Sequence, residues 1–221
     1  MATEDRPRHF HKYCSNQSKG NVMIVIDKDG KVVDKKIKLK ITHSIEKNSM
    51  AKVRGIIIHQ TGGSTAESAF NSYKVGGAGA HFLIDKDGTI YQTASVIKQT
   101  WHVGKLRSRC LAEMTCTATE LSLLKKFDPT RTHRRETGKS VPDRYPSNQD
   151  SIGIEIVGQA LPLTEPDPDK RDYEALTKEQ SEQLKWLVQE LRASLKVPLT
   201  EIFRHPTVSY KNKTEAGNAS W

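Results

Sequence analysis

The chain has 221 residues, enough for one well-buried domain and a small extension. Its formal net charge of +9 predicts attraction to polyanions. Aromatic residues make up only 6%, and no nucleic-acid-binding motif is present, so we expect no nucleic-acid partner. No stretch approaches the roughly 20 apolar residues of a membrane span, and the polar N-terminus lacks the apolar core of a secretory signal. We therefore expect neither membrane insertion nor export by the ordinary route.

Residues 1–50 are predicted to form an extension outside the main domain. Within it, 22–26 is predicted to be a strand, 27–30 an acidic turn and 31–41 the return strand of a β-hairpin. The expected return strand carries three apolar residues on one face: Ile37, Leu39 and Ile41.

The main domain is predicted to span residues 51–221 and to begin with a strand buried on both faces. Residues 53–58 are rich in β-branched side chains, as in the central strands of parallel sheets. This strand ends at His59, where a rigidly held imidazole would face a cleft; a structural histidine in the core is the alternative. Ser64 is the expected N-terminal cap of a helix over 65–75.

Two short strands, 80–84 and 89–92, are predicted to form a hairpin around an Asp-Gly turn. The sequence Trp101-His102-Val103-Gly104 follows it. A long, polar and basic insertion then covers about 105–148 and contains a possible helix over 118–126. Insertions of this length inside a domain are usually functional or mobile.

The three cysteines are Cys14, Cys110 and Cys116. An odd number without paired spacing excludes a dense disulfide framework, and the absence of a C-x-x-C motif argues against a cysteine metal site. Cys110 and Cys116 are close enough in sequence to bridge a small loop, and two free thiols are equally compatible with the pattern.

Residues 151–158 return to the character of a buried strand, in which Glu155 is the only charged residue. Glu155 either lies on an exposed face or is a buried carboxylate that must be paired or functional. Thr177 opens the strongest helix of the chain, with Gln180 completing a capping box. Its apolar stripe comprises Leu184, Leu187, Val188, Leu191 and Leu195.

A second apolar run, 199–204, leads to another histidine, His205, and a carboxylate, Glu215, follows ten residues later. Two histidines and one carboxylate make a three-ligand set that leaves a zinc ion one open position for water. The three residues are far apart in sequence, so only the fold can bring them together. The alternation of strands and helices along the chain predicts an α/β layer fold.

Several motifs, in this order along the chain, resemble the zinc-dependent N-acetylmuramoyl-L-alanine amidase family, which also contains phage amidases and peptidoglycan recognition proteins. They are Ile56-Ile57-Ile58-His59-Gln60-Thr61, Ala80-His81-Phe82-Leu83-Ile84, Trp101-His102-Val103-Gly104, Ser151-Ile152-Gly153-Ile154-Glu155, and 205–217. The resemblance implies a central mixed β-sheet flanked by helices, with Zn²⁺ as cofactor. It also implies hydrolysis of the amide between N-acetylmuramic acid and L-alanine, in peptidoglycan or muropeptides.

By this resemblance the zinc ligands are His59, His205 and Glu215. The third ligand departs from the family, which usually has aspartate or cysteine there, although glutamate is an acceptable oxygen ligand. Lys213, next to the third ligand, is expected to stabilise the oxyanion of the tetrahedral intermediate.

The resemblance also implies the catalytic base. One branch of the family has a tyrosine at the position of Ala80, and the other uses the glutamate that corresponds to Glu155, so Glu155 is the expected base. His81, His102 and Trp101 are expected to contact the substrate. For the two histidines, a position behind the metal ligands and simple packing are the alternatives.

The biological role is expected to be lytic. The extension, the basic insertion and the charge favour an antibacterial effector, delivered by a contact-dependent route such as type VI secretion into the periplasm of a target cell. Such a toxin implies an immunity protein in the producing cell. A cytoplasmic muropeptide-recycling amidase, a phage endolysin and a peptidoglycan-binding module without activity are the alternatives.

Overall fold

The computed structural model describes residues 23–221; Val22, the first residue of the predicted N-terminal strand, and Cys14 lie outside this part. The strands are β1 (Val25–Ile26), β2 (Val32–Val33), β3 (Ile37–Leu39), β4 (Gly55–Gly62), β5 (Phe82–Ile84), β6 (Ile90–Gln92), β7 (Ser151–Leu161), β8 (Asp172–Tyr173) and β9 (Ile202–Arg204). The α-helices are α1 (Ala66–Val75), α2 (Arg109–Ala112), α3 (Ala118–Leu124), α4 (Pro129–Glu136), α5 (Lys178–Leu195) and α6 (His205–Val208). Short 3₁₀ helices are η1 (His43–Ile45), η2 (Pro168–Lys170) and η3 (Leu199–Glu201). Within the described residues, no helix is both long and apolar enough to cross a membrane.

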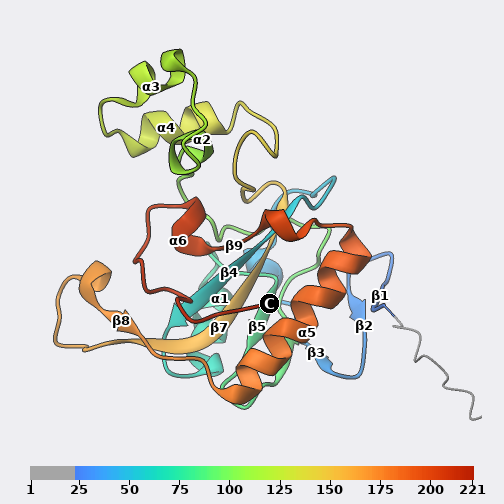
Figure 1. The fold of residues 1–221 in the computed structure, drawn as a ribbon. Helices are drawn as coiled ribbons and strands as arrows, with labels where there is room; N and C mark the ends of the chain where they lie inside the picture. Colours follow the sequence, from blue (N-terminus) through green and yellow to red (C-terminus); the bar gives the residue numbers. More distant parts are fainter. Residues whose placement is uncertain (1–22) are drawn as a thin grey trace, which may run out of the picture.

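A seven-stranded mixed sheet forms the centre of the molecule, in the order β3-β6-β5-β7-β4-β9, with β8 added to β7 (Figure 1). β4 is central and runs parallel to both β7 and β9. The only antiparallel pairs in this sheet are β5–β6 and β7–β8. The predicted α/β fold with a central mixed sheet is therefore confirmed.

Helix α5 covers one face of this sheet (Figure 1). Its predicted capping box is present, because the Thr177 hydroxyl accepts from the Gln180 amide and the Gln180 side chain accepts from the Thr177 amide. The helix buries its apolar stripe against alternate residues of β4 and β7, such as Ile58 and Ile154. Successive strand residues point to opposite faces, so the residues between these isoleucines face away from α5.

Helix α1 packs against the opposite face, where Phe70 and Tyr73 join Leu83 of β5 and Val157 of β7. The predicted helix is confirmed, but its cap is Thr65 rather than Ser64, because the Thr65 side chain accepts from the Ser68 amide. The Thr65 hydroxyl is one residue closer to the helix than that of Ser64 and reaches the Ser68 amide, so the helix begins at Ala66 rather than at Thr65.

The predicted N-terminal hairpin is present but shorter, since β1 pairs only with β2. Residues 37–39 do not continue it, which corrects the predicted return strand. They form β3, which runs parallel to β6 at the edge of the central sheet. Asp34 ends the hairpin, because its side chain accepts from the Lys36 amide and its carbonyl from the Ile37 amide. The predicted domain boundary after residue 50 stays a prediction.

The insertion at 105–148 folds into a small lobe of helices α2, α3 and α4 beside the sheet (Figure 1). A disulfide joins Cys110 and Cys116, which decides between the two alternatives left open by their spacing. The lobe is tied to the main domain by an ion pair between the largely buried Arg109 and Glu201, at 2.9 Å.

Candidate active site

The three predicted metal ligands meet on the side of the sheet that faces away from α5. His59 comes from β4, and His205 from the start of α6 directly after β9. Glu215 comes from the loop after α6, residues 209–221, which we call the closing loop. All three are buried, and their ligand atoms lie within 4.8 Å of one another. Glu215 Oε1 is 2.9 Å from Nδ1 of His205 and 3.4 Å from Nδ1 of His59.

A chain of hydrogen bonds from His59 through His102 and Ser151 determines which nitrogen of His59 carries the proton. The Ser151 hydroxyl donates to the Ser147 carbonyl at 2.6 Å, so it accepts from Nε2 of His102 at 3.2 Å. Burial and the charges of neighbouring histidines keep the pKa of His102 well below 6.5, so its Nδ1 carries no proton. That Nδ1 accepts from Nε2 of His59 at 2.9 Å, which leaves Nδ1 of His59 as a free lone pair.

A hydrogen bond also determines which nitrogen of His205 carries the proton. Its Nε2 is 2.8 Å from the carbonyl oxygen of Val103, which can only accept, so Nε2 carries the proton. With its proton on Nε2, the His205 ring presents the lone pair of Nδ1 towards Glu215. Metal-binding histidines commonly donate their second nitrogen to a carbonyl or another acceptor in this manner.

The donor set of this cluster fits a zinc ion. Two imidazole lone pairs and one carboxylate oxygen converge on one point, and like lone pairs are stable together only around a cation. Burial alone would raise the pKa of Glu215, but positive charge shared with His205 and His59 lowers that pKa to about 2, and a bound cation would supply this charge when both rings are neutral. Burial lowers the pKa of His59 to about 4, which keeps its ring neutral and able to ligate.

Glu155 lies on β7 directly opposite His59 of β4 in the parallel register. Its Oε2 atom is buried and has no hydrogen-bond partner. Burial and the negative charge of Glu215 raise the pKa of Glu155 to about 8, while the charge of Lys211 opposes that rise. A carboxylate whose pKa lies near neutrality can both take and return a proton at the working pH.

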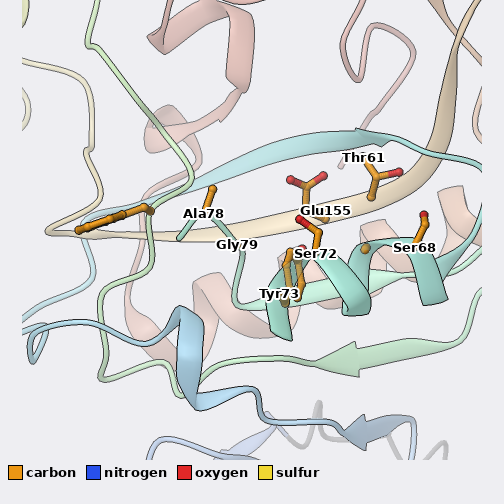
Figure 2. Close-up of a pocket in the computed structure, with 9 residues that line it drawn as sticks. Thr61, Ser68, Ser72, Tyr73, Ala78, Gly79 and Glu155 are labelled. Atoms are coloured by element: carbon orange, nitrogen blue, oxygen red, sulfur yellow. The ribbon is translucent and has the colours of Figure 1, made fainter. Parts of the chain in front are cut away.

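A groove of about 220 Å³ opens beside Glu155, between helix α1 and the strands β4 and β7 (Figure 2). It is lined by Thr61, Ser68, Ala69, Ser72, Tyr73, Ala78, Gly79, Trp101 and Glu155. The walls carry small hydroxyl side chains and two aromatic side chains, Tyr73 and Trp101, a combination suited to a polar ligand with an apolar face. Glu155 and the groove are therefore parts of one site.

The predicted substrate contacts are placed differently from one another. Trp101 is 53% exposed and lines the groove. His81 has no exposed surface, and its two ring nitrogens bond to the Gly153 amide and the Lys98 carbonyl, so it is a packing residue. His102 lies behind His59 rather than in the groove. The prediction of substrate contact is therefore corrected for both histidines: His81 packs in the interior, and His102 hydrogen-bonds to His59 outside the groove.

Lys213, the predicted oxyanion-stabilising residue, is exposed and does not line the groove. The lysine whose charge acts on the site is Lys211, which opposes the raised pKa of Glu155 and contributes to the lowered pKa of His59. Lys211 is itself exposed and, like Lys213, does not line the groove, so it acts on the site only through its charge.

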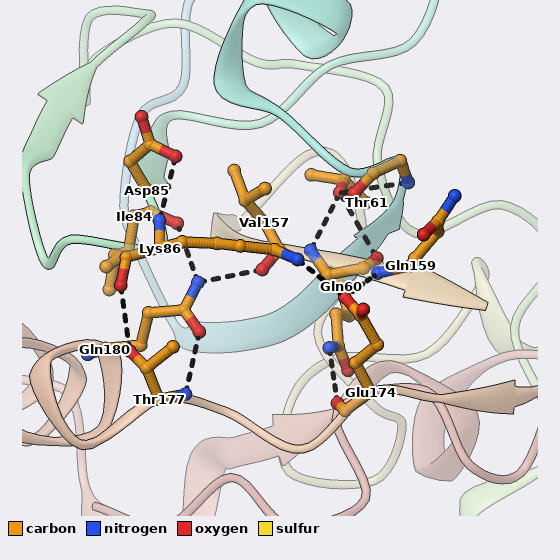
Figure 3. A network of polar contacts seen from close by, with 12 residues as sticks. Gln60, Thr61, Ile84, Asp85, Lys86, Val157, Gln159, Glu174, Thr177 and Gln180 are labelled. Atoms are coloured by element: carbon orange, nitrogen blue, oxygen red, sulfur yellow. Dashed lines mark hydrogen bonds and ion pairs between the residues drawn. The ribbon is translucent and has the colours of Figure 1, made fainter. Parts of the chain in front are cut away.

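A polar network around Gln60 of β4 includes Gln159, Glu174 and Lys86 (Figure 3). The Gln60 side chain accepts from the Ala216 amide and donates to the Glu174 carbonyl. Glu174 in turn accepts from the Gln159 amide and forms an ion pair with Lys86 at 2.9 Å. The residue after His59 therefore positions the residue after Glu215, which was not predicted from the sequence.

Comparison with known protein families and solved structures identifies the family of the chain. Residues 49–218 match the family model described as N-acetylmuramoyl-L-alanine amidase. No curated protein sequence matches the chain. Among solved structures, the catalytic domain of XlyA is 18% identical, with 81% of this chain and 88% of that chain covered and a TM-score of 0.47.

Two further solved structures are similar at the same level. The endolysin amidase LysCS from Clostridium intestinale URNW is 16% identical over 77% of this chain and 82% of its own, with a TM-score of 0.42. AmpDh3 from Pseudomonas aeruginosa is 18% identical over 84% of this chain and 58% of its own, with a TM-score of 0.49. The family match itself spans most of the chain and includes the histidine, glutamate and loop positions described above. The protein therefore belongs to the N-acetylmuramoyl-L-alanine amidases, hydrolases that act on peptidoglycan.

Proposed function

We propose that this protein is a zinc-dependent amidase that cuts the bond between N-acetylmuramic acid and L-alanine in peptidoglycan. The observation that carries the proposal is the convergence of two imidazole lone pairs and the Glu215 carboxylate next to Glu155. His59, His205 and Glu215 would hold the metal. When bound, zinc lowers the pKa of a water molecule towards about 7 and polarises a carbonyl group.

The residues of the chain then divide the work of hydrolysis. Glu155 accepts a proton from the attacking water as its oxygen bonds to the carbonyl carbon, and later gives that proton to the leaving nitrogen as the C–N bond breaks. The products are a carboxylic acid on the muramic acid side and a free amine on L-alanine. Trp101 and the hydroxyl side chains of the groove hold the substrate beside Glu155.

One digestion experiment tests the reaction. Purified sacculi are incubated with the protein, and the soluble products are identified by mass and by labelling of new amino groups. We expect new N-terminal L-alanine, loss of activity with a chelator and recovery with Zn²⁺. Products cut elsewhere in the peptide or the glycan, or full activity in a protein shown to contain no zinc, would overturn the proposal.

A peptidoglycan-binding module without activity is the competing function. Such a module needs no proton acceptor beside the metal cluster, whereas this chain keeps Glu155 with a pKa near neutrality there. The same digestion separates the two, because a binding module would sediment with sacculi and release no amino groups.

We further propose that the protein acts as an antibacterial effector in the periplasm of a target cell and is paired with an immunity protein. Two observations support an oxidising, polyanion-rich site of action: the Cys110–Cys116 disulfide and the net charge of +9. Export to the periplasm of a Gram-negative host should cause lysis, and expression in its cytoplasm should not. Exported Glu155→Gln protein is the matched control and should be harmless. Harmless export of folded, active protein would favour a recycling role.

A further inference from the structure

Four buried side-chain polar atoms in residues 23–221 have no hydrogen-bond partner: Tyr73 Oη, Glu136 Oε2, Glu155 Oε2 and Arg192 Nε. Only two of their residues, Tyr73 and Glu155, line the groove beside the metal cluster (Figure 2). Buried polar groups are almost always paired, so an unpaired donor and an unpaired acceptor in one groove indicate a ligand that pairs both.

The Tyr73 ring is held rigidly. It lies in the last part of α1, is 6% exposed, and packs with Phe70, Leu83 and Val157 in the cluster beneath the groove. The carbonyl of Tyr73 accepts from the Ser44 hydroxyl, which fixes its backbone as well. The backbone amide of Ala80 faces the hydroxyl oxygen and can only donate to it, so the O–H itself has no acceptor in the described residues. A substrate group entering the groove therefore meets a hydroxyl that is already in place.

The chemistry of the two unpaired atoms is complementary to an amide. Burial and the charge of Glu155 hold the pKa of Tyr73 well above 10, so the hydroxyl keeps its proton and acts as a donor. Oε2 of Glu155 accepts in the ionised carboxylate, which is also the form that takes a proton from water. An amide offers the matching pair, a carbonyl oxygen for the hydroxyl and an N–H for the carboxylate.

We propose that Tyr73 is a substrate-binding residue whose hydroxyl donates to the carbonyl oxygen of an amide that adjoins the scissile amide. The adjoining amide is chosen because the scissile carbonyl must face His59, His205 and Glu215, and none of these lines the groove. The groove instead leads from Glu155 to Trp101. Two substrate amides fit this chemistry, the acetamido group of muramic acid and the first peptide bond of the stem. The inference rests on the proposed function.

The test compares Tyr73→Phe with the wild type, both loaded with zinc. The change removes only the hydroxyl and keeps the ring in its cluster. With a soluble muropeptide, KM should rise about 2- to 10-fold, the range of one neutral hydrogen bond, while kcat changes less than twofold. The melting temperature should stay the same or rise, because an unpaired buried hydroxyl has been removed. A fall in melting temperature parallel to a loss of activity would assign Tyr73 a structural role.

A binding experiment keeps the inference separate from the catalytic proposal. N-acetylmuramic acid and an L-alanine-initiated stem peptide, neither of which is cleaved, are titrated into both proteins by calorimetry. Tyr73→Phe should weaken one of the two about 2- to 10-fold, and the affected ligand identifies the amide. Equal affinities of both proteins for both ligands, or no binding by the wild type, would overturn the inference.

The turnover assay tests the proposed amidase activity, and the binding assay tests the contact made by Tyr73. Wild-type protein that binds a fragment through Tyr73 but releases no amino groups contradicts only the proposed function. Tyr91→Phe is the matched control, because Tyr91 packs against the same cluster and does not line the groove. It should leave KM and both affinities unchanged, and a loss equal to that of Tyr73→Phe would overturn the assignment.

Discussion

His59 of β4 and Glu155 of β7 occupy directly paired positions on neighbouring parallel strands. Paired residues point to the same face of a sheet, and neighbouring strands are about 4.8 Å apart. One register therefore sets the separation between the imidazole of His59, a proposed metal ligand, and the carboxylate of Glu155, the proposed base. The flanking isoleucines of both strands are buried under α5, so a slip of the register by one residue would expose them and is strongly disfavoured.

Glu155→Gln should lower turnover by about 100- to 10,000-fold, the usual contribution of general acid–base catalysis. Glutamine has the size of glutamate and hydrogen-bonds, but it does not accept a proton at neutral pH. Zinc content, measured by metal analysis, should be unchanged. A zinc-loaded variant that turns over substrate at the wild-type rate would reject Glu155 as the base.

The same variant should change how stability depends on pH in the metal-free protein. The pKa of Glu155 is about 8 in the folded chain against an ordinary value of 4.5, so folding favours the protonated form. Its contribution is complete below about pH 4.5 and is lost as the pH rises through 8. The melting temperature of Glu155→Gln relative to wild type should therefore increase from pH 5 to pH 8.5. A constant difference across that range would contradict the raised pKa.

Glu215→Ala should reduce zinc affinity by more than the roughly 10- to 100-fold expected for loss of an outer partner, because it removes one of three ligands. Competition with a chromogenic chelator measures the affinity. Glu215→Asp should retain much more of it, since the carboxylate remains. Asp169→Ala, which removes an exposed acid of η2 outside the ligand set, is the control and should bind zinc normally. If Asp169→Ala weakens zinc binding and Glu215→Ala does not, the ligand assignment is wrong.

His102→Ala should lower zinc affinity by about 10- to 100-fold, because His102 accepts from Nε2 of His59 and so keeps the lone pair of Nδ1 free. Ser151→Ala removes the acceptor behind His102 and should have a smaller effect in the same direction. His81→Ala is the matched control, a buried histidine without a hydrogen bond to the metal cluster. Equal losses in His81→Ala and His102→Ala would indicate a packing effect only.

Thiol counting should detect the Cys110–Cys116 bridge. Protein folded in an oxidising compartment should show one reactive thiol per chain after denaturation, and three after reduction. Cys110→Ser should raise the first count to two. Three thiols in periplasmically expressed protein would contradict both the bridge and the support it gives to a periplasmic site of action.

The sequence alone determined the elements whose signals are local. The β-branched run before His59 and the isoleucines around Glu155 predicted strands buried on both faces, and both are central in the sheet. The Thr177–Gln180 capping box and the apolar stripe predicted α5, because a cap and a helical period involve residues only a few positions apart. The family motifs, read in order, indicated the residue types of the site.

Only the tertiary structure decided which distant residues meet. The alternation of apolar and polar residues in 31–41 is compatible with a hairpin strand and with an edge strand of the central sheet. In the structure, β3 pairs with β6. His102 reaches His59 across 43 positions, and Gln60 reaches Ala216 across 156. Tyr73 and Glu155 line one groove only once α1 is packed against the sheet. Local periodicity carries no information about such contacts, because they depend on sheet order and loop path, which the burial of the whole core selects.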